Sequence, residues 1–325
     1  MNNKRIIVIG LGSMGKRRIR LLRFINNNLD IIGVDSNEDR IKQVQEMYGI
    51  ESYKSIDDVD KNNVDIAFVC TSPLSHAVII NKCLKNKWDV FTEINLVDDM
   101  YDENIQLAKD NNKVLFLSST PMYRQEMLEI QECLNENKKP CNYIYHIGQY
   151  LPDWHPWEQF KDFFVGDKRT NGCREIMGIE LPWMTKAFGN IKSVKVVKNN
   201  ISELDINYSD SYLIQLEHEG NNYGMLAVDV VCREAVRKLE IYNDDIYISW
   251  NGTPDTLKIK NKKEEFKKYD NREYIHEEGY GKFVNESAYI NEIRTFFKVL
   301  DGEQAIYSFE NDKKILEIID EIEKD

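Results

Sequence analysis

The sequence lacks the long apolar run that a membrane-spanning helix needs. No stretch approaches the roughly 20 consecutive apolar residues that cross a bilayer, and the first five residues lead directly into a strand-like run. We therefore expect neither a transmembrane segment nor a signal peptide. The sequence also has an excess of acidic residues: 43 residues are lysine or arginine and 55 are aspartate or glutamate, which gives a net charge of −12. This balance argues against nucleic acid as the main partner.

The six cysteines are widely spaced and form no Cys-x-x-Cys pair. Such spacing is poor for a disulfide framework or a zinc site, so we expect reduced cysteines that serve as small hydrophobic residues, and no metal. Reduced cysteines and the missing signal peptide together predict a cytoplasmic protein. The 325 residues, 42% of them hydrophobic, leave room for two globular domains.

The first 120 residues alternate strand and helix patterns. A short apolar run at 5–9 ends in glycine, as a buried parallel strand does, and apolar residues at three-to-four spacing follow it. Asn37 is a plausible N-cap for a second helix. Further strands are predicted at 31–34, 64–70, 90–92 and 114–117. Strands separated by helices of this length imply right-handed crossovers and a doubly wound parallel sheet, which is the Rossmann fold.

After residue 120 the pattern becomes one of hairpins and helices. Alternating strands flank the turn at 219–222, and a second pair flanks Asn243-Asp244-Asp245. Helices are predicted at 286–300 and 311–323. We therefore predict an α/β chain with a dinucleotide-binding Rossmann domain over residues 1–120. An α+β domain built on an open, mostly antiparallel sheet then occupies residues 121–325.

A glycine-rich motif follows the first predicted strand and opens the first helix, with the sequence Gly10-Leu11-Gly12-Ser13-Met14-Gly15. Gly10 permits the tight turn, Gly12 lets the backbone approach a pyrophosphate, and Gly15 allows close packing of helix on strand. The amide groups at the helix N-terminus then face the phosphates. Because the motif stands in the strand–turn–helix context, we expect Gly10, Gly12, Ser13, Met14 and Gly15 to bind the cofactor.

Asp35 ends the second predicted strand, twenty residues after Gly15. A carboxylate at this place accepts hydrogen bonds from the adenosine ribose hydroxyls and repels a 2′-phosphate. Arg40 is the one nearby residue that could hold such a phosphate. The sequence therefore favours NAD over NADP.

Two further segments, Thr71-Ser72-Pro73-Leu74-Ser75-His76 and Val90-Phe91-Thr92-Glu93, give the chain a resemblance to the glucose–fructose oxidoreductase/inositol dehydrogenase (Gfo/Idh/MocA) family. The resemblance extends over nearly the whole chain. It implies hydride transfer between a nicotinamide and a sugar, cyclitol or nucleotide sugar, and a homo-oligomer that forms through the second domain's sheet. It also implies that Thr71, Ser72, Pro73 and His76 line the cofactor site and that Glu93 lies near the nicotinamide ribose. Ser72 and Pro73 would also fit an ordinary helix start, as cap and first residue.

The chain departs from this family at the residues that transfer protons. Where the family has Glu-Lys-Pro, this sequence has Glu93-Ile94-Asn95, and isoleucine cannot polarise a substrate oxygen. Where the family has Asp-x-x-x-His on a helix, counting back from Gly189 gives Glu175 and Ile179. A shift of one residue in the alignment would place Glu180 at the histidine position instead.

Other groups must therefore carry the proton if the reaction takes place. Glu175 is the first candidate, and Glu180 and Lys186 are further ones. The loop at 149–158 resembles that of family members from surface-glycan and sugar-nucleotide pathways. We expect the substrate to contact Tyr123, Trp154, His155 and Arg174, although Trp154 could equally pack in the core.

Three hypotheses for the function stay open. The first is an NAD-dependent oxidoreductase that acts on a sugar or nucleotide sugar. The second is a dinucleotide-binding protein without hydride-transfer activity. The third is an enzyme that uses tightly bound NAD for a redox-neutral reaction.

Overall fold

The computed structural model describes residues 4–154, 158–262, 264–268, 275 and 283–324. The chain divides into two compact units, Met1–Ser119 with Tyr289–Lys313, and Thr120–Ala288 with Lys314–Asp325. The sequence analysis assigns everything after residue 120 to the second domain, whereas in the structure 289–313 pack with the first. Among the described residues, no helix combines the length and apolar character that a membrane crossing requires.

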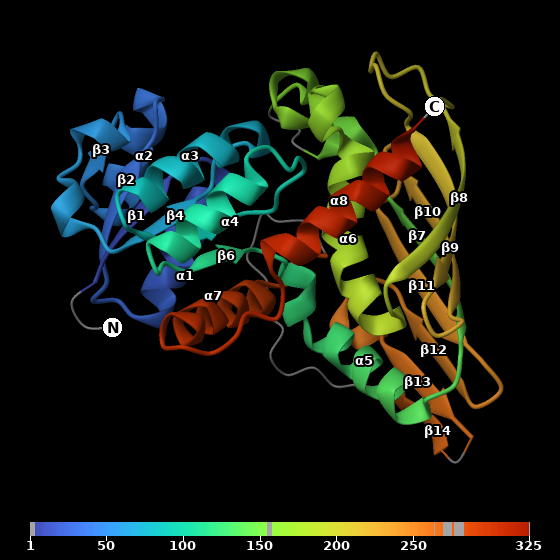
Figure 1. The fold of residues 1–325 in the computed structure, drawn as a ribbon. Coiled ribbons are helices and arrows are strands. Elements are labelled where there is room, and N and C mark those ends of the chain that lie inside the picture. Colours follow the sequence, from blue (N-terminus) through green and yellow to red (C-terminus); the bar gives the residue numbers. More distant parts are fainter. Residues whose placement is uncertain (1–3, 155–157, 263, 269–274, 276–282, 325) are drawn as a thin grey trace. The chain divides into compact units, whose positions relative to one another are not determined.

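The first unit is built on a six-stranded parallel sheet with the strand order β3-β2-β1-β4-β5-β6 (Figure 1). Its strands are β1 (Arg5–Ile9), β2 (Asp30–Val34), β3 (Ser52–Tyr53), β4 (Ile66–Val69), β5 (Asp89–Thr92) and β6 (Leu115–Leu117). Its helices are α1 (Ser13–Ile25), α2 (Glu38–Tyr48), α3 (Pro73–Lys85) and α4 (Tyr101–Asp110), with much of α7 (Glu286–Leu300) and the start of α8 (Phe309–Glu323). The strand order reverses between β1 and β4, which is where doubly wound sheets bind ligands. The predicted Rossmann fold is confirmed.

A row of aromatic residues explains why the C-terminal segment joins this unit. Phe68, Phe91 and Phe116 stand in register on β4, β5 and β6 and stack on their neighbours at centroid distances of 4.7 and 5.2 Å. Phe296 of α7 meets all three rings edge-on at 5.4 to 5.5 Å. Burying these four rings removes a large apolar area from water, which anchors α7 on the sheet.

The second unit is built on an eight-stranded sheet with the order β14-β13-β12-β11-β7-β10-β9-β8. Only the pair β7–β10 is parallel and the other neighbours are antiparallel, so the predicted open, mostly antiparallel sheet is confirmed. Its strands are β7 (Asn142–Gly148), β8 (Ile191–Asn199), β9 (Ser211–His218), β10 (Tyr223–Asp229), β11 (Val236–Tyr242), β12 (Ile246–Trp250), β13 (Lys258–Asn261) and β14 (Glu264–Lys268). Both predicted hairpins form: β9–β10 turns through Gly220 and Asn221, whose φ angles are +85° and +63°, and β11–β12 turns at 243–245.

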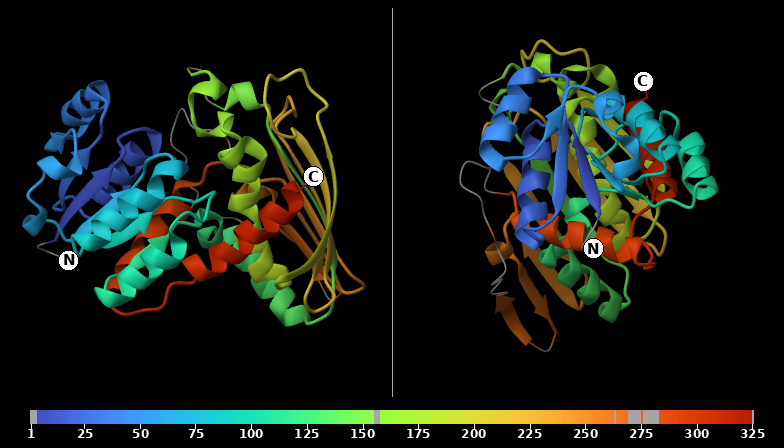
Figure 2. Two further views of the ribbon diagram at one scale, coloured as in Figure 1. Left: turned by 45° about the horizontal axis from the view of Figure 1, so that its top comes forward. Right: turned by 90° about the vertical axis from the view of Figure 1, so that its left-hand side faces the viewer.

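Helices α5 (Gln125–Asn137) and α6 (Gly172–Phe188) lie on one face of this sheet (Figure 2). Tyr143 stacks on Phe188 at 4.2 Å, and Tyr145 meets Trp183 edge-on at 5.9 Å. Alternation along β7 therefore sends Tyr143 and Tyr145 toward α6 and leaves Ile144 on the opposite face. These ring contacts help to hold α6 on the sheet.

Candidate functional site

The glycine loop joins β1 to α1 with very little space around it. Gly10 has a φ of +90°, and a Cβ there would lie 2.7 Å from the backbone of Cys70, at the end of β4. A Cβ on Gly15 would lie only 1.9 Å from the carbonyl oxygen of Gly10. Gly12 is the N-cap of α1 and has no side chain with which to cap it. The first amide groups of α1 are thus left for a ligand, as a pyrophosphate site requires.

Asp35 lies beside this loop, at the carboxyl end of β2. Its carboxylate accepts hydrogen bonds from the amide of Leu11 (2.7 Å) and from the amide of Asn37 (2.8 Å), and the residue is only 7% exposed. Arg40 reaches the same place, with Nη1 3.7 Å from Oδ2 of Asp35. The structure therefore places Asp35, which would accept from the ribose hydroxyls, beside Arg40, which could hold a 2′-phosphate.

The start of α3 lies against the loop, since the amide nitrogen of Thr71 would be 2.8 Å from a Cβ on Gly10. Ser72 is the N-cap and Pro73 follows it, as predicted. Ser72 thus holds the predicted N-cap position, but its side chain makes no capping hydrogen bond with the described residues. The hydroxyl of Ser75 donates hydrogen bonds to the carbonyl oxygen of Ser72 and to Oγ1 of Thr71, both at 2.8 Å.

His76 is buried rather than open to a ligand. Its Nε2 lies 2.8 Å from the carbonyl oxygen of Thr71, and its Nδ1 lies 2.7 Å from Oδ1 of Asn95. Burial lowers the pKa of the imidazole. Asn95 stands where the family resemblance implies proline. Its contact with His76 connects the segment after β5 to the first turn of α3.

Glu93 belongs to a buried ion-pair network that the sequence analysis missed. Arg18 of α1 donates to Oε1 (2.5 Å) and Oε2 (2.9 Å) of Glu93, and to Oε2 of Glu292 on α7 (2.8 Å). Burial opposes the charge of Arg18, but the two carboxylates outweigh it and raise the pKa of the guanidinium. Burial also raises the pKa of Glu292. Arg18 falls within the apolar stripe of the helix predicted after the glycine motif. A charged residue at such a position is the sequence signal for a buried ion pair.

The candidate proton-transfer residues lie on α6, whose N-cap is Asn171. The Oδ1 of Asn171 caps the helix by accepting from the amide of Arg174 (2.8 Å). Glu175, in the first turn, is partly exposed, and its carboxylate makes no hydrogen bond or ion pair with any residue that the structure describes. Burial raises the pKa of its carboxyl to about 7. Ile179 is one turn further along the same face and is also partly exposed.

Glu180 has the opposite surroundings, because its side chain is only 1% exposed. Its carboxylate accepts hydrogen bonds from Tyr145 (2.9 Å) and from the indole of Trp183 (2.7 Å), and it forms an ion pair with Arg237. These three donors hold the carboxylate in place, and its burial closes it off from solvent. We therefore assign Glu180 a structural role and do not propose it for proton transfer.

The remaining sequence candidates are spread over the second unit. Arg174 forms ion pairs with Asp320 (2.7 Å) and Glu323 (2.5 Å), so it holds α8 against α6. Lys186 lies near the end of α6, and partial desolvation lowers the pKa of its ammonium group. Tyr123 is buried, and the indole of Trp154 donates to the carbonyl oxygen of Gln149 (3.1 Å). His155 lies outside the described residues.

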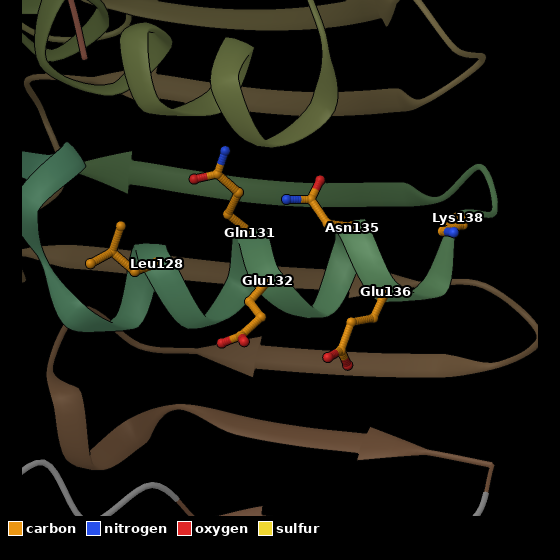
Figure 3. Close-up of a pocket in the computed structure, with 6 residues that line it drawn as sticks. All are labelled: Leu128, Gln131, Glu132, Asn135, Glu136 and Lys138. Carbon is orange, nitrogen blue, oxygen red and sulfur yellow. The ribbon is translucent and has the colours of Figure 1, made fainter. Parts of the chain in front are cut away.

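A shallow hollow of about 610 Å³ lies along the outer side of α5 (Figure 3). It is lined by Leu128, Gln131, Glu132, Asn135, Glu136 and Lys138. None of the candidate cofactor or catalytic residues lines it. A helix surface this open, carrying flexible polar side chains, does not have the concave and largely apolar form of a small-molecule site.

Comparison with known proteins agrees with this geometry. Residues 4–119 match the model of the oxidoreductase family with an NAD-binding Rossmann fold, the Gfo/Idh/MocA family. This segment of the chain is similar to that family. Its Rossmann unit is accordingly an NAD-binding one, with the glycine loop and Asp35 at the expected strand ends.

A curated relative, the myo-inositol 2-dehydrogenase of Thermotoga maritima, is 30% identical over 136 residues. The alignment spans only 40% of this chain and 40% of the relative. Solved structures extend the similarity in fold to the second unit. UDP-N-acetylglucosamine 3-dehydrogenase from Acidithiobacillus ferrooxidans has a TM-score of 0.75 at 17% identity, covering 99% of this chain and 97% of that one. A levoglucosan dehydrogenase in complex with NADH and L-sorbose has a TM-score of 0.79 at 14% identity, covering 98% and 96%.

Proposed function

We propose that the protein is an NAD-dependent oxidoreductase that acts on a CH–OH group of a sugar, cyclitol or nucleotide sugar. The observation that carries this proposal is the uncapped start of α1 beside the buried Asp35, a cradle that fits a pyrophosphate and the adjoining ribose. The names of two similar proteins agree with this substrate class, since one is a myo-inositol 2-dehydrogenase and the other a UDP-N-acetylglucosamine 3-dehydrogenase. A role in surface-glycan synthesis would agree with the nucleotide-sugar alternative.

Within this proposal, Glu175 moves the proton. Oxidation of an alcohol removes a hydride from carbon, for which NAD is the acceptor, and a proton from oxygen. Glu175 receives that proton, because its pKa of about 7 lets it accept and release a proton near neutral pH. Glu180 is buried and held by three donors, and Arg174 is ion-paired, so both are poorer candidates.

The experiment is an assay of NADH formation with purified protein over a panel of cyclitols, free sugars and nucleotide sugars. We expect turnover with at least one of them, and Glu175→Gln to lower kcat by roughly 10²- to 10⁴-fold, the usual contribution of a positioned acid–base group. NAD affinity should stay unchanged in this variant. Glu132→Gln, which alters an exposed carboxylate on α5, is the matched control and should retain full activity. Undiminished turnover in Glu175→Gln would remove Glu175 from the mechanism.

One observation favours a second candidate, a dinucleotide-binding protein without hydride transfer. Ile94 and Ile179 occupy the positions at which the family resemblance implies lysine and histidine, and both are partly exposed rather than locked in the core. NAD binding with no change in its redox state across the whole panel would support this candidate. Transient reduction of bound NAD without net NADH would instead indicate a redox-neutral reaction.

We further propose that the protein assembles into a homo-oligomer through the outer face of the eight-stranded sheet. Large apolar side chains that are 36% to 58% exposed lie on this face. They are Ile144, Val197, Leu213, Tyr223, Met225, Tyr242 and Tyr247. An exposed apolar patch of this kind marks an interaction surface. Leu213→Lys should lower the molar mass measured by light scattering, while Leu128→Lys on α5 should leave it unchanged.

A further inference from the structure

Three side chains of different chemistry converge at the carboxyl ends of the parallel strands β7 and β10. They are His146 in β7, Asp229 at the end of β10, and Cys232 just after it. One ligand atom from each, a ring nitrogen, a carboxylate oxygen and the thiol sulfur, lie within 4.8 Å of one another. His146 and Asp229 are 83 residues apart, so no spacing rule reveals the cluster.

The carboxylate of Asp229 is held in place by the backbone. Its Oδ1 accepts hydrogen bonds from the amides of Val231 (3.0 Å) and Cys232 (2.7 Å). Its Oδ2 is directed toward His146, 2.8 Å from Nε2. Backbone donors that fix one oxygen of a ligating carboxylate while the other faces the metal are a common outer shell of metal sites.

Gly148 makes room for this arrangement. It stands in register with Asp229 across the β7–β10 pair, and a Cβ on it would lie 2.5 Å from a carboxylate oxygen of Asp229. Any other residue at this position would displace the carboxylate. The ligand atoms therefore occupy a space that the strand leaves open for them.

We propose that His146, Asp229 and Cys232 bind a zinc ion. Imidazole, carboxylate and thiolate are the ligands that zinc takes, at about 2.0 to 2.3 Å and in tetrahedral geometry, which leaves the fourth position to water. The thiol of Cys232 donates to the carbonyl oxygen of Glu234 (3.0 Å), and it turns from there to the metal with loss of its proton. Lys238 stands beside His146 on β11, but it is exposed and can extend its ammonium group into solvent.

The test is a calorimetric titration of chelator-treated full-length protein with zinc, in two buffers that differ in ionisation enthalpy. We expect one site per chain, with release of the Cys232 proton appearing as a buffer-dependent heat. Cys232→Ser and His146→Gln should each weaken binding at least tenfold. Cys133→Ser, which alters a partly exposed thiol on α5, should bind zinc as the unaltered protein does.

Cobalt(II) supplies a second measurement, since a cobalt–thiolate bond absorbs strongly in the near ultraviolet. The band should form with the unaltered protein and with Cys133→Ser, and disappear in Cys232→Ser, whose thermal midpoint without metal should be unchanged. Binding that is absent, or equally tight in Cys232→Ser and His146→Gln, would show an ordinary His–Asp pair beside an unrelated cysteine. Neither result depends on NAD binding or turnover.

Discussion

The two helices that flank β2 begin in opposite ways. At the start of α2, Oδ1 of Asn37 accepts from the amides of Asp39 (2.9 Å) and Arg40 (3.3 Å). At the start of α1, Gly12 occupies the same position without a side chain. The chain thus satisfies one helix end by itself and leaves the other to be satisfied by a ligand.

The same contrast appears between two carboxylates on α6. Glu180 has three donors and holds the helix to the sheet, whereas Glu175, just over one turn earlier, has none among the described residues. Even partial burial of a carboxylate without a partner costs stability, and such a cost points to a functional position. Substitutions should therefore damage stability at the satisfied groups and function at the open ones.

The largest loss of stability is expected from Arg18→Met. It would leave Glu93 and Glu292 buried side by side without their shared cation, and removing one partner from a buried ion pair costs about 3–5 kcal/mol. Urea unfolding would measure the change. Lys42→Met, on the exposed face of α2, should alter stability by less than about 0.5 kcal/mol. Equal effects of the two variants would mean that the buried network is not a stabilising feature.

Glu175→Gln should stabilise the protein at alkaline pH. Folding raises the pKa of Glu175 from 4.5 to about 7, so its contribution to stability is complete below pH 4.5 and is lost as the pH rises through 7. The variant has no such loss. Its stability relative to the unaltered protein should therefore rise between pH 5 and pH 8, by at most about 3 kcal/mol. A difference that does not vary with pH would show that Glu175 is solvated.

Asp35→Ala should weaken NAD binding by roughly 10- to 100-fold, the worth of one or two hydrogen bonds to a charged group. NADP binding should fall less, because Arg40 remains and the repulsive charge is gone. Isothermal titration with both cofactors measures the ratio. Asp39→Ala, which removes an exposed carboxylate from the first turn of α2, is the control. Unchanged affinity for both cofactors in Asp35→Ala would contradict the position assigned to the ribose.

The smallest effect is expected from Asn37→Ala. Loss of its cap should cost about 1 kcal/mol in urea unfolding, with NAD affinity unchanged. This would separate the capped helix, which serves stability, from the uncapped one, which serves the ligand. If the variant instead lost NAD binding and kept its stability, the contrast between the two helix ends would be wrong.

Local sequence patterns predicted most of the fold, but little of the surroundings of the candidate proton-transfer residues on α6. Helix 286–300 and both hairpins follow from residue spacing and turn residues, because such signals act over a few neighbours. The position of 289–313 in the first unit does not, since it depends on Phe296 meeting three rings from distant strands. The sequence placed Glu175 ahead of Glu180 as the proton-transfer residue, but it could not show that Glu180 is buried among three donors.

The sequence by itself determined the Rossmann unit, its glycine loop and the acid at the end of β2, because each of these is encoded by consecutive residues around one turn. Only the tertiary structure decided which charged groups are satisfied. Arg18 meets Glu93 and Glu292 across 75 and 274 residues, and Glu180 meets Arg237 across 57. Partners so far apart are chosen by how strands and helices pack, and this packing leaves the partly buried carboxylate of Glu175 without a partner among the described residues.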